Sequence, residues 1–383
     1  MPSPPADIFT FFKGRVALHA ILQAAGIGAG DQVLLPGYTC VVVPNAVLYR
    51  GAEPVYLDIA ADTYNIDLAA AEAGAGTRWD PRRARVLIVQ HTYGIPCDMD
   101  AVADFARRHD LLVIEDACHT LGSTYRGRPV GGFGQAAFYS SQWSKPVTTG
   151  LGGWAVVNDP ALRERVREVA AGYRAPRASE VWLLYLQHLV YGVVFRPSLF
   201  WIIQDLYRRL GDLGLVIGSS TGTELACEMP ADYEKLMGAP QRRRLLHLLR
   251  RSAEMIAERR RHTAVIVEAL QAAGLPTVRL PDAYDPVYLR YPLQVGNKDA
   301  VLARARHRRI QLGDWFLSPV HPNRQSWEAA GYRAGLCPVA ETVSRRTVNI
   351  PTGGGIRHRD LERTVAFLAE CAEPVAGAQA SAS

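Results

Sequence analysis

Residues 140–153 read SSQWSKPVTTGLGG, a stretch that sets Lys145 between small hydroxyl residues and a glycine-rich turn. Lysine is scarce in this chain: it occurs only at positions 13, 145, 235 and 298, while arginine supplies nearly all the other positive charge. Arginine serves as a surface cation, but only a lysine amine can lose its proton and attack a carbonyl. The stretch therefore predicts a reactive amine at Lys145.

An acid and a hydroxyl group accompany this amine. Residues 111–116 read LLVIED, which predicts a strand that carries Asp116 to its carboxyl end. Ser140 ends another predicted strand, five residues before Lys145. Pyridoxal phosphate (PLP) chemistry needs an amine for the aldehyde, an acid for the pyridine nitrogen, phosphate donors and a flat neighbour for the ring. The pattern indicates a PLP site in which Lys145 holds the aldehyde, Asp116 pairs with the ring nitrogen and Ser140 donates to the phosphate.

Strands and helices alternate through the first half of the chain. We expect strands at 33–35, 54–58, 85–90, 111–115, 136–140 and 153–158, and helices at 14–26, 41–49 and 98–109. This order predicts an α/β fold, with a mostly parallel sheet covered by helices. Ligands of such sheets bind at the carboxyl ends of the strands, where Asp58, His91, Asp116 and Ser140 fall.

The second half has a different pattern. It predicts a long arginine-rich helix or helix pair at 240–273, strands near 288–295, a helix at 298–308 and a last helix at 358–373. We therefore expect a large PLP-binding domain over 1–240 and a smaller C-terminal α+β domain over 241–383. The tail 374–383 consists mostly of small residues and is expected to be disordered.

An apolar insert at about 175–225 interrupts this organisation. Its residues 181–195 are nearly all apolar, and a second apolar stretch runs from 198 to 210. Fifteen residues are too few to span a bilayer, which needs about twenty. Two interpretations stay open: a dimer interface or lid packed on the large domain, and a helical hairpin of 181–210 that dips into a membrane surface between its aromatics and arginines.

The composition limits the class of protein. The net charge of +6 is mild for 383 residues, and the arginine clusters are scattered without interleaved aromatics, which argues against a nucleic-acid partner. Six cysteines without CxxC spacing favour a reduced, cytoplasmic protein, and no signal peptide opens the chain. We expect no metal site.

Further cofactor contacts are expected from two segments. Gly14, Arg15 and Val16 open the first helix, whose amides and dipole attract a phosphate. Arg15 either adds a direct ion pair to that phosphate or is a solvated residue at the helix start. His119 lies three residues past Asp116; it either reaches the cofactor's 3-hydroxyl or stacks on the ring, or it is a structural, half-buried histidine.

The chain resembles the DegT/StrS-like family of fold type I PLP-dependent sugar aminotransferases. The resemblance runs from about Gly14 to Glu373 and is interrupted by the insert. Its motifs, in order, are GIGAGDQV at 26–33 with PGYT at 36–39, GAEPVYLD at 51–58, HTYGIPCDM at 91–99, EDACHTLG at 115–122, the Lys145 stretch, and CPVAE at 337–341 leading to NIP at 349–351.

The resemblance implies a homodimer with active sites at the subunit interface. It implies that Lys145, Asp116, Ser140 and the Gly14–Arg15 turn hold the cofactor. It also implies transfer of an amino group, usually from glutamate, to a keto group of a nucleotide-linked sugar or a cyclitol. Among the catalytic residues we place Lys145, Asp116 and His119, and as candidate substrate contacts Tyr93 and His321.

The sequence departs from the family pattern at two cofactor positions. Gly14–Arg15 stands where the family has Gly–Thr, and Cys40 stands where an aromatic residue often stacks on the ring, so that Tyr38 or His119 is expected to take that role. Together with the insert, these changes are compatible with a lipid-linked or otherwise apolar keto substrate. They are also compatible with a protein that binds peripherally to the inner face of the membrane.

Two alternatives to an aminotransferase remain. One is another PLP reaction on a keto sugar, such as dehydration, but the family's dehydratases replace the lysine that is present here as Lys145. The other is a non-catalytic PLP-binding regulator or membrane scaffold, although no DNA-binding helix-turn-helix is evident in the sequence.

Overall fold

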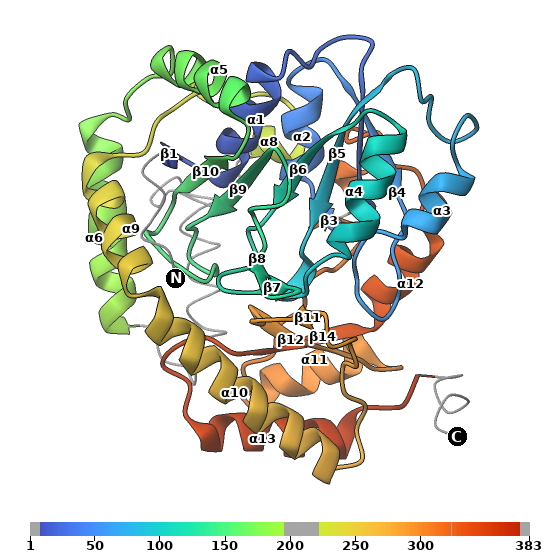
Figure 1. The fold of residues 1–383 in the computed structure, drawn as a ribbon. Coiled ribbons are helices and arrows are strands. Elements are labelled where there is room, and N and C mark those ends of the chain that lie inside the picture. Colours follow the sequence, from blue (N-terminus) through green and yellow to red (C-terminus); the bar gives the residue numbers. More distant parts are fainter. Residues whose placement is uncertain (1–7, 195–221, 323, 376–383) are drawn as a thin grey trace.

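The protein is described here by a computed structural model that covers residues 8–194, 222–322 and 324–375. Its centre is a seven-stranded sheet with the strand order β1-β10-β9-β6-β5-β2-β4, seen in Figure 1. The strands are β1 Ile8–Phe11, β2 Gln32–Pro36, β4 Glu53–Leu57, β5 Ala84–Gln90, β6 Leu112–Asp116, β9 Ala136–Ser140 and β10 Gly153–Val157.

The expectation of a mostly parallel sheet is confirmed. Strands β4, β2, β5, β6 and β9 pair in parallel, whereas β10 is antiparallel to both β9 and β1. The segment 141–152, which contains Lys145, connects the end of β9 to the start of β10 without an intervening helix. A chain that turns back directly onto the neighbouring strand pairs with it in the antiparallel direction. The edge strand β1 was not anticipated.

Helices cover both faces of this sheet because its strands are apolar on both sides. Val33 and Leu35 of β2 belong to the core cluster that contains Leu18 of α1, while Leu34 belongs to a second cluster with Phe105 of α4. The helices of this half are α1 Gly14–Ala24, α2 Val42–Leu48, α3 Leu68–Ala73, α4 Met99–Arg108 and α5 Pro160–Ala171, with the short elements β3 Thr39–Cys40, η1 Thr92–Gly94, β7 Thr124–Tyr125 and β8 Arg128–Pro129.

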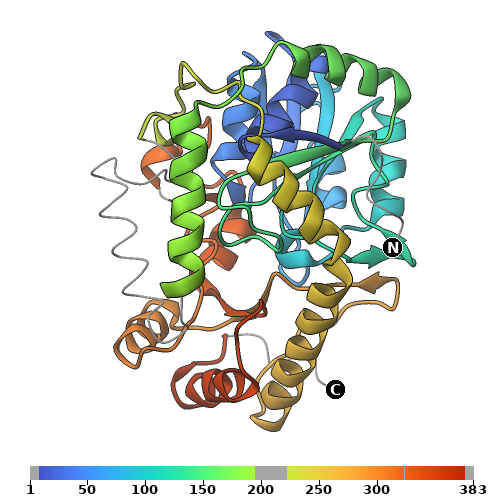
Figure 2. The same cartoon turned by 90° about the vertical axis from the view of Figure 1, so that its left-hand side faces the viewer.

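The expected helix pair is present in the second half. It consists of α9 Ala239–Arg250 and α10 Ser252–Ala272, and α10 packs on the last helix, α13, at the end of the molecule opposite α5 (Figures 1 and 2). The other elements are β11 Tyr284–Asp285, β12 Arg290–Gln294, α11 Lys298–His307, β13 Val320–His321, η3 Arg324–Ser326, α12 Pro338–Arg346, β14 Thr347–Pro351 and α13 His358–Cys371. We call residues 252–375 the small lobe; a domain boundary near residue 240 stays a prediction.

The insert begins as helix α6, Ala178–Val194, and ends in the short helix α8, Gly222–Leu225. Leu184 of α6 packs against Phe12, which follows β1, and Leu151, which precedes β10. The side chains of Trp182 and Leu186 on the same helix are 70% and 57% exposed. No helix within the described residues is long and apolar enough to cross a membrane. The second apolar stretch, 198–210, and most of the tail from 374 lie outside the described residues.

Candidate functional site

The carboxyl ends of β6 and β9 bring the predicted amine and acid together. Asp116 is the last residue of β6, Ser140 is the last residue of β9, and the loop after β9 carries Lys145. The amine of Lys145 is close enough to Asp116, Cys118 and His119 to lower the pKa of each of them, although burial has the larger effect on all three. The sequence therefore identified neighbours in space from positions 29 residues apart.

Asp116 is almost completely buried. Burial raises the pKa of its carboxyl group, while the backbone N–H of Cys118, which donates to Oδ1 over 3.0 Å, and the charge of Lys145 act in the opposite direction. A buried carboxylate with one backbone hydrogen bond retains lone pairs for a cationic partner. Asp116 is thus suited to bind a protonated ring nitrogen.

His119 is held as a neutral ring. Burial, followed by the charges of Lys145 and Arg290, lowers its pKa well below the ordinary value. Its Nδ1 accepts the backbone N–H of Tyr93 over 3.2 Å, which leaves the ring proton on Nε2 as a donor. His119 therefore offers both a flat face and a hydrogen-bond donor beside Lys145, and its contact with the cofactor stays a prediction.

The start of α1 is packed tightly against the end of β9. A Cβ atom added to Gly14 would lie 2.9 Å from the carbonyl oxygen of Tyr139 and 3.0 Å from Cβ of Ser140. A Cβ atom added to Gly153 of β10 would lie 2.3 Å from both N and Cα of Gly14. The two glycines let the first turn of α1, including Val16, approach Ser140 as a phosphate site requires.

Arg15 points into a buried ion cluster. Its Nη1 donates to Oε1 of Glu224 over 2.7 Å, and Nζ of Lys13 donates to Oε2 of the same carboxylate over 3.0 Å. Glu224 is 1% exposed and comes from α8, at the end of the insert. Sequence reasoning missed this acid, and a direct contact of Arg15 with a phosphate stays a prediction.

Tyr38 and Tyr93 lie in an aromatic core between the large sheet and the small lobe. Both are fully buried, and their hydroxyl groups are hydrogen-bonded to each other over 2.8 Å. Tyr38 also accepts the backbone N–H of Phe316, and the hydroxyl of Tyr93 donates to the carbonyl of Trp315. Burial raises the pKa of both phenols. Their roles as a ring neighbour and a substrate contact stay predictions.

Cys40 and His321 are neighbours in a short parallel ladder. The strands β3 and β13 pair Cys40 with His321, and both side chains are half-buried. Nδ1 of His321 accepts the backbone N–H of Leu317 over 3.2 Å. Since its ring centroid is 6.4 Å from that of Trp315, His321 belongs to the same region as Lys145, and its contact with substrate stays a prediction.

Two residues of this region escaped the sequence analysis. The ring of Trp315 stacks on His119 with 5.7 Å between centroids, and Nζ of Lys145 lies 5.0 Å from the Trp315 ring centroid. The guanidinium carbon of Arg290 lies 5.1 Å from the same centroid. No local pattern marks either residue, because Trp315 contacts Lys145 and His119, which lie 170 and 196 positions earlier in the chain, and Arg290 joins this region through Trp315.

Two other polar residues at strand ends have structural partners. Both carboxylate oxygens of Asp58 accept backbone N–H groups at the start of α12, at 2.9 Å each. His91 donates from Nε2 to Glu115 over 3.1 Å and accepts from Cys97 at Nδ1. Glu115 also accepts the backbone N–H groups of residues 131, 133 and 134. The hydrogen bonds of Asp58, His91 and Glu115 therefore stabilise the loops that follow the strands at this edge of the sheet.

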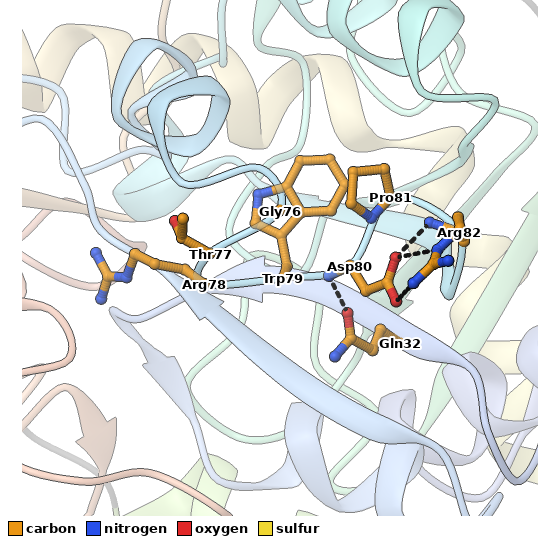
Figure 3. Close-up of a pocket in the computed structure, with 8 residues that line it drawn as sticks. All are labelled: Gln32, Gly76, Thr77, Arg78, Trp79, Asp80, Pro81 and Arg82. Carbon is orange, nitrogen blue, oxygen red and sulfur yellow. Dashed lines mark hydrogen bonds and ion pairs between the residues drawn. The ribbon is translucent and has the colours of Figure 1, made fainter.

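A surface pocket lies elsewhere. It is lined by Gln32 and residues 76–82, and the backbone N–H of Asp80 donates to Gln32 over 2.8 Å (Figure 3). Gln32 is the first residue of β2, so this pocket opens at the amino-terminal edge of the sheet. Asp116 and Ser140 lie at the opposite edge, and we assign this pocket no part in the reaction.

The lysines provide a test of whether the residues fit PLP. Lys13 binds Glu224, Lys235 binds Glu180 and Asp232, and Lys298 donates to three backbone carbonyls. The side-chain amine of Lys145 forms no hydrogen bond or ion pair with the part of the chain that the structure describes. With Asp116, the His119 face and the glycine-lined start of α1, Lys145 completes a donor set that fits the cofactor.

Comparison with known proteins gives an independent result. Residues 8–183 and 242–369 match the model of the DegT/DnrJ/EryC1/StrS aminotransferase family. The gap between the matched segments contains most of the apolar insert. The match covers far more than half of the chain, on both sides of the insert.

Relatives of known name agree with this match. The chain is 44% identical to GDP-perosamine synthase of Caulobacter vibrioides over 155 residues, which are 40% of each protein. It is 28% identical to UDP-N-acetyl-3-dehydro-alpha-D-glucosamine 3-aminotransferase of Acidithiobacillus ferrooxidans over 93% of this chain and 82% of that one. The crystal structure of a DegT/DnrJ/EryC1/StrS aminotransferase from Brucella abortus superposes with a TM-score of 0.72 at 20% identity, covering 95% of this chain and 85% of that chain.

Proposed function

Because the chain belongs to the DegT/DnrJ/EryC1/StrS aminotransferase family and is a PLP-dependent aminotransferase, we propose that its acceptor is the keto group of a nucleotide-linked sugar or a cyclitol. The donor is an amino acid, with glutamate as the first choice. The observation that carries this proposal is Lys145, whose amine lies beside Asp116 and His119 while the other three lysines are engaged in hydrogen bonds and ion pairs.

Each residue of the site has a task in such a transfer. When bound, PLP supplies an aldehyde that carries the amino group and a ring that accepts electrons from the reacting carbon. Asp116 would keep the ring nitrogen protonated through a charge-assisted hydrogen bond. The amine of Lys145 takes a proton from the donor's α-carbon and returns one to the former keto carbon of the acceptor. Nε2 of His119 would be available to donate a hydrogen bond to the bound cofactor.

Mapping of the cofactor and of its reaction tests this proposal. Borohydride treatment of the PLP-loaded protein and peptide mapping are expected to place the adduct on Lys145, with no adduct in Lys145→Ala. The loaded protein is then exposed to glutamate and to a panel of keto sugars, cyclitols and keto lipids, and products are read by mass spectrometry. An adduct on another lysine, or no aminated product from any acceptor, contradicts the proposal.

The assembly is a homodimer in this proposal, with the two sites at the subunit interface. The support is the family membership and the exposed apolar side chains of α6, Trp182 and Leu186, which gain free energy when covered. Sedimentation of the wild type and of Trp182→Asp tests this: a wild-type monomer contradicts the dimer. Flotation with anionic vesicles tests the other use of this face, contact of 181–210 with a membrane, which is rejected if the intact protein never floats.

A cytoplasmic location is part of the same proposal. All six cysteines are free thiols, and four of them are buried. A reducing compartment keeps such thiols unpaired. Fractionation of cells that express the full chain tests the location.

A further inference from the structure

The loop that carries Lys145 is held by two helices that lie outside the sheet. The indole ring of Trp143, which comes shortly before Lys145, stacks on the imidazole of His188 in α6, with 5.7 Å between the ring centroids and 17° between the ring planes. Shortly after Lys145, the carbonyl of Thr148 accepts a hydrogen bond from Nε of Arg244 in α9 over 3.3 Å. The loop is therefore contacted by the insert before the lysine and by α9 after it.

Trp143 also connects the two ends of this loop. A Cβ atom added to Gly150 would lie 3.2 Å from Cζ2 and 3.3 Å from Cη2 of the Trp143 ring, so the indole lies directly against that turn. The base of the loop is closed, because the backbone N–H of Thr149 donates to the carbonyl of Ser141 over 2.9 Å. Since packing at such distances leaves no free space, a shift of the indole must displace the backbone on both sides of Lys145.

The insert reaches this loop with one face of α6. Leu184 packs against Leu151, and His188, one helical turn further along, contacts Trp143. Side chains at this spacing lie next to each other on the surface of a helix. Both Leu184 and Leu151 are almost completely buried. The same face of α6 therefore contacts the loop at two points, one before Lys145 and one after it.

Electrostatics favour an uncharged stack. Burial, and then the charge of Arg244, lower the pKa of His188 below its ordinary value. His188 is thus neutral at pH 7 and presents a flat aromatic face to the indole of Trp143. Stacking of two rings at this separation is attractive, and it fixes the angle between the rings as well as their distance. Because the charge of Arg244 reaches His188, the contacts before and after Lys145 belong to one cluster of neighbouring side chains.

We propose that His188 and Trp143 are positioning residues for the amine of Lys145: through their stack, the insert helix holds the loop in the arrangement in which the amine reaches the cofactor aldehyde. This inference rests on the proposed function, because it takes Lys145 as the reactive amine. A displacement of about 1 Å at a reacting group can lower a rate by about a hundredfold. A stack that does not touch the reacting atoms therefore still sets the rate, and the insert has a task in the reaction.

The test follows the attachment of PLP to the full chain from which the cofactor has been removed. Absorbance gives the rate, and borohydride treatment with peptide mapping places the adduct. His188→Ala and Trp143→Ala are each expected to slow attachment to Lys145 at least fivefold. The double variant is expected to be within twofold of the slower single variant, since the second substitution removes a contact that the first has already broken. His247→Ala, at an exposed histidine of α9, is the matched control and is expected to match the wild type.

Rescue by ring shape separates positioning from a general loss of stability. His188→Phe keeps a flat ring that can stack on the indole and is expected to attach PLP within twofold of the wild type. His188→Leu has no flat ring and is expected to be as slow as His188→Ala. In the loaded protein, the conversion of the cofactor by glutamate without any acceptor is expected to lose maximal rate in His188→Ala, while the half-saturating glutamate concentration stays within twofold.

The inference is overturned if His188→Ala attaches PLP as fast as His247→Ala, or if the double variant is slowed by the product of the two single effects. Equal rates in His188→Phe and His188→Leu also overturn it, and this comparison decides should Trp143→Ala not fold, by its thermal unfolding curve. In the wild type, an adduct on a residue other than Lys145 contradicts the proposed function itself. An adduct on Lys145 with uncoupled variants contradicts the positioning role alone.

Discussion

The contact between α1 and β10 provides a sharp prediction, because replacement of Gly153 by alanine places an atom where the backbone of Gly14 lies. The added Cβ would be 2.3 Å from N and Cα of Gly14 and 2.6 Å from the carbonyl carbon of Lys13. Since carbon atoms in contact prefer about 3.5 Å, the start of α1 must move by about 1 Å away from the sheet. Both partners are backbone, so no side-chain rotation relieves the clash.

Two effects of different size are expected from Gly153→Ala. Overpacking of this kind costs about 2–3 kcal/mol in unfolding free energy, which lowers the melting temperature by roughly 5 °C in a chain of this length. The moved turn also loses a hydrogen bond to the phosphate of the cofactor. One such bond to a charged group is worth about 1.5–3 kcal/mol, so PLP affinity falls by roughly ten- to a hundredfold.

The assay measures binding of PLP and of pyridoxal, which lacks the phosphate, together with thermal unfolding. Gly153→Ala is expected to lose affinity for PLP and to keep its affinity for pyridoxal within threefold. Gly28→Ala is the matched control, since its Cβ would meet nothing closer than an oxygen at 3.8 Å. Equal losses for the two ligands would refute the phosphate site at α1, and wild-type stability would refute the packing argument.

Three further variants test the charged groups around the site. Glu115→Gln is expected to lower the unfolding free energy at pH 7 by about 2 kcal/mol and to make this free energy less dependent on acid pH. Although burial opposes ionisation, hydrogen bonds from His91 and backbone amides hold the pKa of Glu115 low, so its stabilising effect is present above about pH 4.5 and is lost as the pH falls through the pKa of the folded state. An unfolding free energy that falls at acid pH as steeply in the variant as in the wild type, measured with urea, would contradict this. Glu224→Gln removes the carboxylate that pairs with both Lys13 and Arg15, and is expected to cost about 3–5 kcal/mol in urea unfolding. Part of this loss is expected to be reversed when Lys13→Met is added. A loss of less than about 1 kcal/mol would show that this ion cluster does not hold α8 in place. Lys298→Met removes the donor of three backbone carbonyls, two of them in buried hydrogen bonds, and is expected to cost about 1–3 kcal/mol while the borohydride adduct stays on Lys145. An adduct that disappears with Lys298 would overturn the assignment of the amine.

Much of the large sheet was predictable because its strands are short apolar runs with a recognisable end. Residues 111–115 and 136–140 were expected as strands; β6 lies within one residue of the first range at each end, and β9 has the bounds of the second. The edge strand β1 was missed, since four residues after a proline-rich start form no clear pattern. Its role depends on pairing with β10, more than 140 residues later, which a local pattern does not contain.

The candidate site was predictable only where its residues stand at strand ends or in loops with unusual composition. Lys145, Asp116 and Ser140 fall in this class. The sequence also placed Asp58 at the edge where ligands bind, but the structure assigns both its carboxylate oxygens to the start of α12. A position at a strand end predicts that a side chain lies at the ligand-binding edge of the sheet, but it does not predict which group that side chain will bind.

The chemistry was predicted from the sequence alone, from a rare lysine on a glycine turn, an acid at the end of an apolar strand and a glycine at the start of the first helix. Those features are local, because strand length, turn geometry and side-chain reactivity depend on a few adjacent residues. Only the tertiary structure decided that Glu224 forms an ion pair with Arg15 and that Lys145 and Arg290 both lie close to the ring of Trp315. Arg15 and Glu224 are 209 positions apart, and Lys145 and Trp315 are 170 apart, so packing of the insert and of the small lobe against the sheet brings them together.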